Sequence, residues 1–374
     1  MRIIRSQSKF LKLLNIKIIY LISIRNRLIK ELMMNIFSRG ILLENRENND
    51  ETYNSSKNSP FVFKTTDADI KDDAFHGSDY PRYTEWWYFD SILDNGYSAQ
   101  MSVRVLSIIK NRFIPVFQRL DLYKDGELIH HNKKRYSFKK FEKSKELPSV
   151  KLDGKQVIKG YINKEGKLVY DLSFDVKNTS ADLKFVSLTK GWMGNNPGRD
   201  MWAVLLPRAK VTGTLKIDGD EIKVKGHGYH DHNWDVRYAA AKNNLGWFWG
   251  KINFNNFTTI WATIFKTRSI GQPILVVNEI EGNYYNIKPK DITFIGSNLK
   301  NDSGKNIPYT FKLKAKTNEV DLDIDMNVTK THHDKIMLRY HYWRYHVHCT
   351  GHIKIKNKME KVDKLQIAEF LNFR

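Results

Sequence analysis

The stretch YTEWWYFDSILDNGYSAQMSVRVLS, residues 83–107, contains the pattern that decides the fold. Aromatic and β-branched residues lie on both sides of a central Asp94-Asn95-Gly96. Runs of this composition favour extended strands, and Asn-Gly between two such runs is a strong signal for a hairpin turn. The stretch therefore predicts a strand, a tight turn and a second, antiparallel strand.

The same pattern recurs along the chain. Hairpin turns are predicted at Asp125-Gly126, Glu165-Gly166 and Asp218-Gly219, each between two apolar runs. Residues 309–317 and 319–329 alternate apolar and polar side chains with a period of two, as half-buried strands do. After Pro60 no long helical pattern is found, so the sequence predicts an all-β chain of antiparallel hairpins.

Two pairs of similar segments indicate an internal duplication. WWYFDSILDNGYS, residues 86–98, aligns with WFWGKINFNNFTT, residues 247–259. VTGTLKIDGDEIKV, residues 211–224, aligns with CTGHIKIKNKMEKV, residues 349–362. Each half would open with an aromatic strand and close with a lysine-rich hairpin. Lengths of this kind suit two tandem lipocalin-like β-barrels, which we expect at residues 61–238 and 239–374.

Residues 1–60 differ from the rest of the chain in composition. Residues 10–37 are apolar but interrupted by lysine and arginine, which predicts a short amphipathic basic helix, and residues 44–60 are a polar, Asn- and Ser-rich linker. We interpret the helix either as an appended segment, since Met33 and Met34 are alternative starts, or as an anchor at the membrane surface.

Composition narrows the class of protein. The 374 residues suffice for two domains, and one cysteine, Cys349, cannot form an internal disulfide. The net charge of +21 is spread along the chain without a nucleic-acid recognition pattern, so we expect no nucleic-acid partner. No uninterrupted apolar run is long enough for a spanning helix. We expect a cytoplasmic monomer, with peripheral contact to an anionic membrane as a further hypothesis.

EWWYFD, residues 85–90, is the first candidate for chemistry. On a strand, Glu85, Trp87 and Phe89 share one face, and the other three residues share the opposite face. An inward Glu85 among indole rings would have a raised pKa and act as an acid. The alternative interpretation is a tryptophan core with Glu85 at its rim, paired with Arg82 or Arg104.

GHGYHDHNWD, residues 226–235, is the second candidate. His230, His232 and Trp234 share one face of a strand, opposite Asp231 and Asn233. One interpretation is an acid–base site, because a carboxylate between two imidazoles has a pKa that depends on them. Another is a hydrogen-bonded corner in which Asp231 and Asn233 cap backbone amides and Trp234 closes a barrel end.

A metal site is the third interpretation of the same stretch. His-x-His at positions 230 and 232 can chelate from a strand, with His227 as a further ligand. The second half of the chain supplies four more histidines, His341, His346, His348 and His352. A glutamate at the position that such sites use is missing.

Three motifs resemble, in their order and spacing, the carotenoid 1,2-hydratase and AttH-like family, which includes kievitone hydratase-like proteins. The motifs are EWWYF, GHGYHDHNW and GWFWGKI. The resemblance covers residues 61–374 and implies two lipocalin-like barrels with an apolar ligand cavity and no metal or organic cofactor. It implies a hydro-lyase that adds water to a C=C bond of an isoprenoid or lipid by acid catalysis. The resemblance places the family's site at His232 and Trp234, with Asp231, Asn233 and Glu85 near by and with Trp247 and Trp249 lining the pocket. Together with the residue types above, we expect these to be catalytic: Asp231, His232, Glu85 and Asn233. We expect these to bind the ligand: Trp86, Trp87, Tyr88, His230, Trp234, Trp247 and Trp249.

One feature departs from this family. The carotenoid hydratases add an aspartate on the strand after the GWFWGKI motif, whereas residues 258–263 here are TTIWAT, and no acidic residue occurs between Asp235 and Glu279. The proton would therefore come from Asp231 or Glu85. Two alternatives stay open: a binding protein that carries an apolar ligand unchanged, and a cyclase or isomerase that uses the same cavity.

Overall fold

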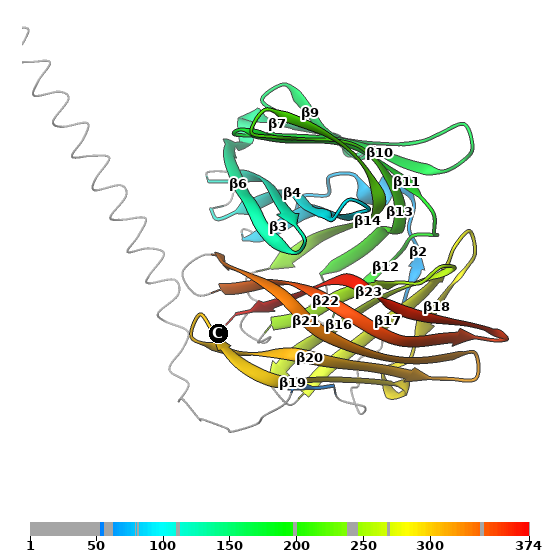
Figure 1. Cartoon of the computed structure of the whole chain (residues 1–374). Coiled ribbons are helices and arrows are strands. Elements are labelled where there is room, and N and C mark those ends of the chain that lie inside the picture. Colours follow the sequence, from blue (N-terminus) through cyan, green and yellow to red (C-terminus); the bar gives the residue numbers. More distant parts are fainter. Residues whose placement is uncertain are drawn as a thin grey trace, which may run out of the picture. The chain divides into compact units, whose positions relative to one another are not determined.

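The structure is a computed structural model that describes residues 53–55, 63–78, 80, 82–109, 113–196, 200–237, 246–267, 270–336 and 340–373. Within these residues the chain is all β, with two antiparallel, barrel-like sheets and three short 3₁₀ helices (Figure 1). The helices are η1 (Ile70–Asp73), η2 (Phe138–Lys140) and η3 (Pro289–Asp291). The predicted fold class is confirmed. The predicted N-terminal helix and the domain boundary at 238/239 lie outside the described residues.

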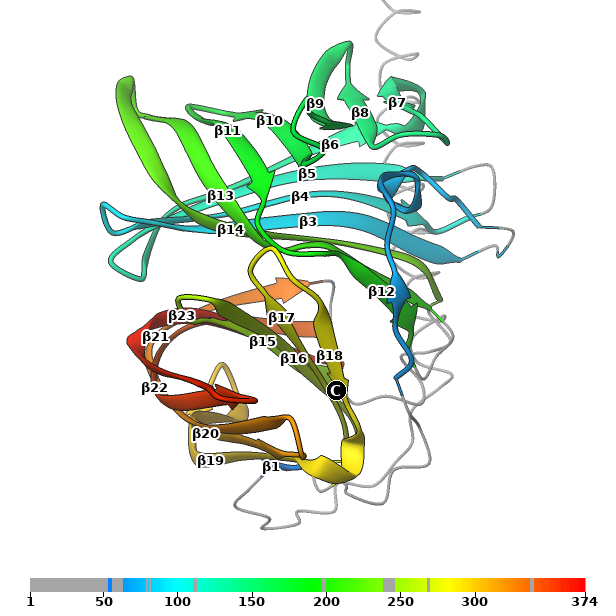
Figure 2. The same ribbon diagram turned by 90° about the vertical axis from the view of Figure 1, so that its right-hand side faces the viewer.

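The first sheet carries both sequence motifs of the first half, on the neighbouring strands β3 and β14 (Figure 2). Its order is β6 (Glu127–Ser137), β5 (Pro115–Lys124), β4 (Tyr97–Ser107), β3 (Tyr83–Leu93), β14 (Asp220–Arg237), β13 (Met201–Ile217), β11 (Thr179–Ser187), β10 (Leu168–Val176), β9 (Lys155–Ile162), β8 (Ser149–Leu152) and β7 (Phe141–Lys143). The short strands β12 (Trp192–Asn195) and β2 (Thr66–Asp67) pair beside β13. Asn132 of β6 donates to Thr179 Oγ1 of β11 (2.7 Å), which joins distant parts of the curved sheet.

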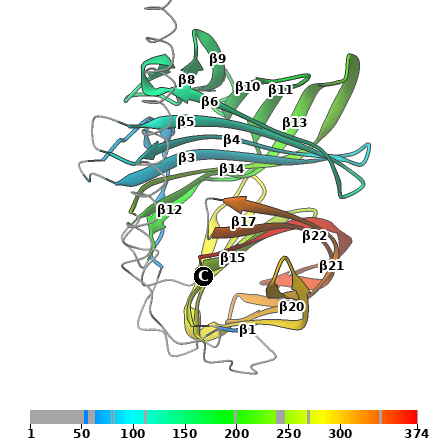
Figure 3. The ribbon, with the colours of Figure 1, turned by 90° about the vertical axis from the view of Figure 1, so that its left-hand side faces the viewer.

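The second sheet follows the same plan (Figure 3). Its order is β1 (Tyr53–Asn54), β19 (Ile292–Asp302), β20 (Lys305–Lys316), β21 (Val320–Ile336), β22 (Tyr340–Ile355), β23 (Lys358–Asn372), β15 (Gly246–Asn253), β16 (Phe257–Thr267), β17 (Ile270–Glu279) and β18 (Tyr284–Ile287). Ser55, which follows β1 inside the predicted linker, forms a bridge to Gly271 of β17 and so connects the two sides of this sheet. No helix in the described part of the chain is long and apolar enough to cross a membrane.

Strand alternation separates the core of each sheet from its outer face. Trp87 and Phe89 of β3 point into the first core, whereas Tyr88 points to the other side, into a third aromatic cluster shared by both sheets. On β15, Phe248 points into the second core and Trp249 into the shared cluster. The two sheets therefore contact each other through their outer faces, and we call this contact region the junction.

The duplication seen in the sequence extends to the junction. The alignment matches Tyr88 with Trp249 and Asp90 with Lys251. In the structure the rings of Tyr88 and Trp249 lie 5.7 Å apart, and Asp90 forms an ion pair with Lys251. The two copies thus meet through equivalent positions, and an acid in one copy faces a base in the other.

The second repeated segment shares a strained glycine. Gly213 of β13 has φ 153° and Gly351 of β22 has φ 139°. A Cβ at either position would fall on a carbonyl oxygen of the neighbouring strand, that of Asp182 or Asp323 respectively. Both copies therefore need glycine at this point.

We expect Gly351→Ala to lower the free energy of unfolding by about 1–3 kcal/mol, because alanine strains the backbone here and meets a fixed carbonyl. Urea denaturation measures the loss. Gly304→Ala is the control, since Gly304 also has positive φ (78°) but no atom near the added methyl group. Equal losses in the two variants would contradict the steric explanation.

Candidate functional site

The predicted site residues divide between two faces of the same strands. His230 and His232 of β14 point into the first core together with Glu85 and Trp87 of β3. The alternate residues of these strands point to the junction. Those are Trp86, Tyr88, Tyr229, Asp231 and Asn233. Trp247 and Trp249 of β15 join the junction from the second sheet.

The inner cluster consists of Asp73, Glu85, His230 and His232, which are all fully buried. His232 lies between the two carboxylates, with Nε2 3.1 Å from Glu85 Oε1 and Nδ1 3.3 Å from Asp73 Oδ1. His230 Nε2 lies 2.9 Å from Asp73 Oδ2, and its Nδ1 donates to the carbonyl of Tyr88 (3.0 Å). Each nitrogen of the two imidazole rings therefore faces an oxygen acceptor. In the part of the chain that the structure describes, no three acidic, His or Cys side chains are arranged to hold a metal ion.

Asp73 is a member of this cluster that the sequence analysis missed. It ends η1, whose start is capped by Asp69 accepting from the Ile70 amide (2.6 Å). Trp87 Nε1 donates to the Asp73 carbonyl (2.9 Å), and the hydroxyl of Tyr170 donates to its carboxylate (2.7 Å). The segment between two short elements carries no periodic signal, so nothing in the sequence pointed to Asp73.

Glu85 lies in the core, whereas the alternative interpretation placed it at the rim. Its Oε1 accepts from the backbone N–H of His76 (2.9 Å) and its Oε2 from that of Gly77 (2.8 Å). The His76 ring stacks on Trp234 (4.0 Å between centroids, 5° between planes) and covers this end of the cluster. Arg104 lies over the ring of Trp86 (4.9 Å).

The charges of the inner cluster stabilise one another. Burial alone would lower the pKa of His232, but hydrogen bonds and charge from Asp73 and Glu85 outweigh burial and raise it to about 9. Burial would likewise raise the pKa of Asp73, but His230 and His232 lower it to about 2. The cluster therefore holds an imidazolium ion, stacked on Trp87 at 4.5 Å.

A pH dependence of stability follows. The pKa of His232 is higher in the folded protein than its ordinary 6.5, so its contribution is fully present below pH 6.5 and is lost as pH rises through about 9. We expect the free energy of unfolding of the wild type to exceed that of His232→Gln most strongly below pH 6.5. Urea denaturation at several pH values measures this difference. A difference that does not narrow toward pH 9 would contradict the assignment of the charge.

The junction cluster consists of Asp231, Asn233, Tyr229, Trp202 and Trp249. Asp231 Oδ2 accepts from the hydroxyl of Tyr229 (2.7 Å) and from Trp202 Nε1 (2.9 Å), and its Oδ1 accepts from Asn233 Nδ2 (3.0 Å). Burial raises the pKa of Asp231 to about 6 although the hydrogen bonds from Tyr229 and Trp202 act in the opposite direction. The carboxyl group of Asp231, which is surrounded by aromatic rings, is thus protonated in weakly acidic solution.

A second group of polar residues adjoins the junction cluster. The Tyr88 hydroxyl lies 2.5 Å from Glu369 Oε1 of β23 and accepts from Arg344 NH1 of β22 (2.7 Å). The same guanidinium group forms an ion pair with Glu369 (2.9 Å). The ring of Trp249 contacts both groups, 5.7 Å from the ring of Tyr88 and 4.8 Å from that of Tyr229. Glu369 and Arg344 come from the end of the chain and were not predicted.

Solvent access distinguishes the two clusters. The side chains of the inner cluster are 0% exposed, whereas Asp231 and Trp249 are 6% exposed, Tyr88 is 7% and Glu369 is 9%. Trp86 and Trp247 are partly exposed and pack at the edge of the aromatic cluster. The junction cluster is therefore more accessible to solvent than the inner cluster.

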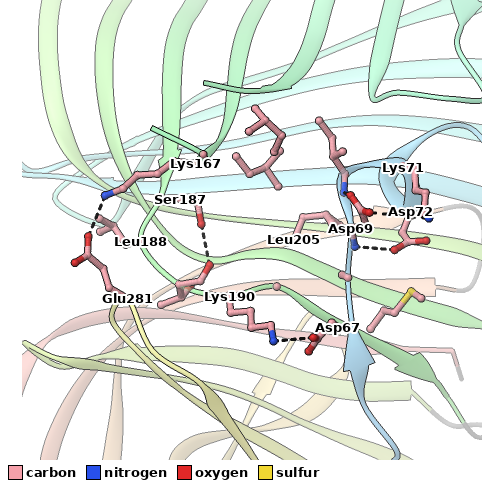
Figure 4. Close-up of a pocket in the computed structure, with 18 residues that line it drawn as sticks. Asp67, Asp69, Lys71, Asp72, Lys167, Ser187, Leu188, Lys190, Leu205 and Glu281 are labelled. Carbon is pink, nitrogen blue, oxygen red and sulfur yellow. Dashed lines mark hydrogen bonds and ion pairs between the residues drawn. The ribbon is translucent and has the colours of Figure 1, made fainter. Parts of the chain in front are cut away.

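A groove of about 880 Å³ is lined by residues that belong to neither cluster (Figure 4). Leu188 and Leu205 contribute apolar surface, and the ion pairs Lys167–Glu281 (2.9 Å) and Lys190–Asp67 (2.6 Å) lie at its sides. None of the predicted site residues lines it. Its lysine side chains are paired with carboxylates, so we assign the chemistry to the junction and not to this groove.

Comparisons with known proteins agree with this fold. A family model described as AttH-like matches residues 166–360. Hydroxyneurosporene dehydrogenase of Chlorobaculum tepidum is 22% identical in an alignment 252 residues long. The alignment covers 56% of this chain and 64% of the relative, so the chain spans less than two thirds of the relative's length.

Solved structures resemble the chain over most of its length. A putative AttH from Nitrosomonas europaea aligns with a TM-score of 0.61 at 14% identity, over 81% of this chain and 95% of that protein. Kievitone hydratase from Nectria haematococca aligns with a TM-score of 0.50 at 13% identity, over 77% of this chain and 88% of that protein. Because the family model matches more than half of the sequence, this chain belongs to the AttH-like family.

Proposed function

We propose that this protein adds water to a carbon–carbon double bond of an apolar, isoprenoid-like ligand at the junction, with Asp231 as the proton donor. The observation that carries the proposal is a buried carboxyl group with a pKa raised to about 6, among the rings of Trp202, Tyr229 and Trp249. An acid with a pKa near the working pH is both protonated and able to transfer its proton. The family includes a hydratase, and the proposal extends that activity to this chain.

The reaction would begin with proton transfer from Asp231 to the double bond, which forms a tertiary carbocation. The faces of Trp249 and Tyr229 stabilise a cation through their negative quadrupole potential and keep bulk water away. Asn233 donates one N–H to Asp231, and its carbonyl oxygen can accept from a water molecule beside the cation. Attack by that water forms the alcohol. In this scheme the inner cluster, with His232 and Glu85, supports strand β14 and does not touch the ligand.

The test uses the purified full-length chain and a series of acyclic isoprenoids. Mass spectrometry after incubation distinguishes the candidate functions. A product heavier than its substrate by one water supports the proposal. Recovery of the bound ligand unchanged would favour a carrier protein, and a product of the same mass as its substrate would favour a cyclase or isomerase. Either result would overturn the proposal if no member of the series is hydrated.

A further inference from the structure

The junction contains a carboxylate where the sequence indicated a missing one. On β15, Trp249 is flanked in register by Ala262 of β16 and by Glu369 of β23. The neighbour β16 contains the segment TTIWAT, residues 258–263, in which no residue is acidic. Glu369 lies on the other side of the same tryptophan and faces the junction, since Ala368 and Phe370 point into the second core. Glu369 lies beside the aromatic wall of the junction, since it contacts the hydroxyl of Tyr88, whose ring is 5.7 Å from that of Trp249.

Glu369 is held by strong partners on one side and is open on the other. Its Oε1 receives Arg344 NH1 (2.9 Å) and lies 2.5 Å from the Tyr88 hydroxyl. The Arg344 side chain is fully buried, yet its Nε and NH2 have no hydrogen-bond partner among the described residues. Buried charged donors without a partner are costly, so an oxygen acceptor is expected beside them.

Asp90 is a third carboxylate of the junction, besides Asp231 and Glu369, and its Oδ2 lies 3.1 Å from the same Tyr88 hydroxyl. It is 0% exposed, and its charge is compensated by the ion pair with Lys251, which is 2% exposed. Glu369 is 9% exposed and is therefore more accessible to solvent than Asp90. The two acids thus differ in partner and exposure: Asp90 is paired with Lys251 across the two sheets, and Glu369 is the more exposed of the two.

From this arrangement we propose that Glu369 is the general base of the junction and that Arg344 holds the attacking water, an inference that rests on the proposed hydration. The water would accept from Arg344 Nε or NH2 and donate to Glu369. Asp231 loses its proton to one alkene carbon, the water oxygen bonds to the resulting cation, and the water's second proton passes to Glu369. Return of that proton to Asp231 through solvent at the partly exposed junction completes a cycle whose net reaction is alkene plus water to alcohol.

The first test measures kcat, KM and ligand affinity of Glu369→Gln on the substrate that the wild type hydrates. Glutamine keeps an oxygen for Arg344 and Tyr88 but removes the charge that faces buried Arg344, so the variant is expected to be less stable than the wild type, and kcat is compared at a temperature where urea denaturation shows both to be folded. General base catalysis contributes about 10²–10⁴-fold, so kcat should fall by about that factor with unchanged affinity. Glu369→Asp should restore part of the rate, and Glu221→Gln, on the exposed start of β14, is the matched control.

The second test separates the base from the acid. Glu369→Gln should still show the alkaline limb that Asp231 gives to the pH profile of kcat/KM, because this variant leaves the acid in place. If Glu369→Gln keeps the wild-type kcat while Asp231→Asn is inactive, the role of Glu369 is refuted and hydration stands. If the wild type hydrates nothing, both proposals fail together.

Discussion

Asp231→Asn is expected to lower kcat/KM for hydration by about 10²–10⁴-fold, the usual contribution of a general acid. The variant removes the only proton donor of the scheme but keeps the shape of the side chain. Its amide oxygen can accept from Tyr229 and Trp202 in place of Oδ2, and the amide of Asn233 can turn to present its oxygen to the new N–H₂ group. The stability of the fold should therefore change little. Steady-state kinetics and urea denaturation of the same preparation check both expectations.

The control for this substitution is Asp175→Asn, which changes the same atoms at an exposed position paired with Lys155. It should leave the rate unchanged. The wild type adds a further check, because Asp231 must be protonated to act. Since its pKa is raised to about 6, kcat/KM should fall as pH rises through about 6. An Asp231→Asn variant with wild-type turnover, or a rate that does not fall above pH 6, would remove Asp231 from the mechanism.

Much of the fold could be predicted because hairpins are local. The signals for a hairpin lie in consecutive residues: a turn such as Asp94-Asn95-Gly96 or Asp218-Gly219, and strands on either side in which apolar and polar residues alternate. The duplication could be predicted as well, since Gly213 and Gly351 recur at a position that both copies require for the same backbone reason. The packing of the outer faces of the two sheets could not be predicted, because it joins residues far apart in the sequence, such as Asp90 and Lys251.

The candidate site was predicted in part, for a related reason. The alternation of side chains along a strand predicts that His232 and Asp231 lie on opposite faces of β14. It does not predict that both faces are buried, one in the first core and the other at the junction. Sequence analysis therefore assembled one site from residues that the structure divides between two clusters. Asp73 and Glu369 reach these clusters through a 3₁₀ segment and a strand pairing that leave no periodic signal.

Asp73→Asn is expected to lower the free energy of unfolding by about 3–5 kcal/mol, the usual cost of removing one partner from a buried ion pair. The carboxylate of Asp73 serves both histidines of the inner cluster and accepts from Tyr170. An amide oxygen can keep the Tyr170 bond but carries no charge to balance the His232 imidazolium. Urea denaturation near neutral pH measures the loss.

The surface pair Asp175–Lys155 again provides the comparison, because an exposed ion pair contributes only about 0–1 kcal/mol. The effect of Asp73→Asn should also depend on pH. Loss of the Asp73 charge lowers the pKa of His232 from about 9 toward its ordinary value, so the cost is largest where wild-type His232 is charged and shrinks as pH rises above 9. A loss no larger than that of Asp175→Asn, or one independent of pH, would show that the inner cluster is neutral and that Asp73 acts through hydrogen bonding alone.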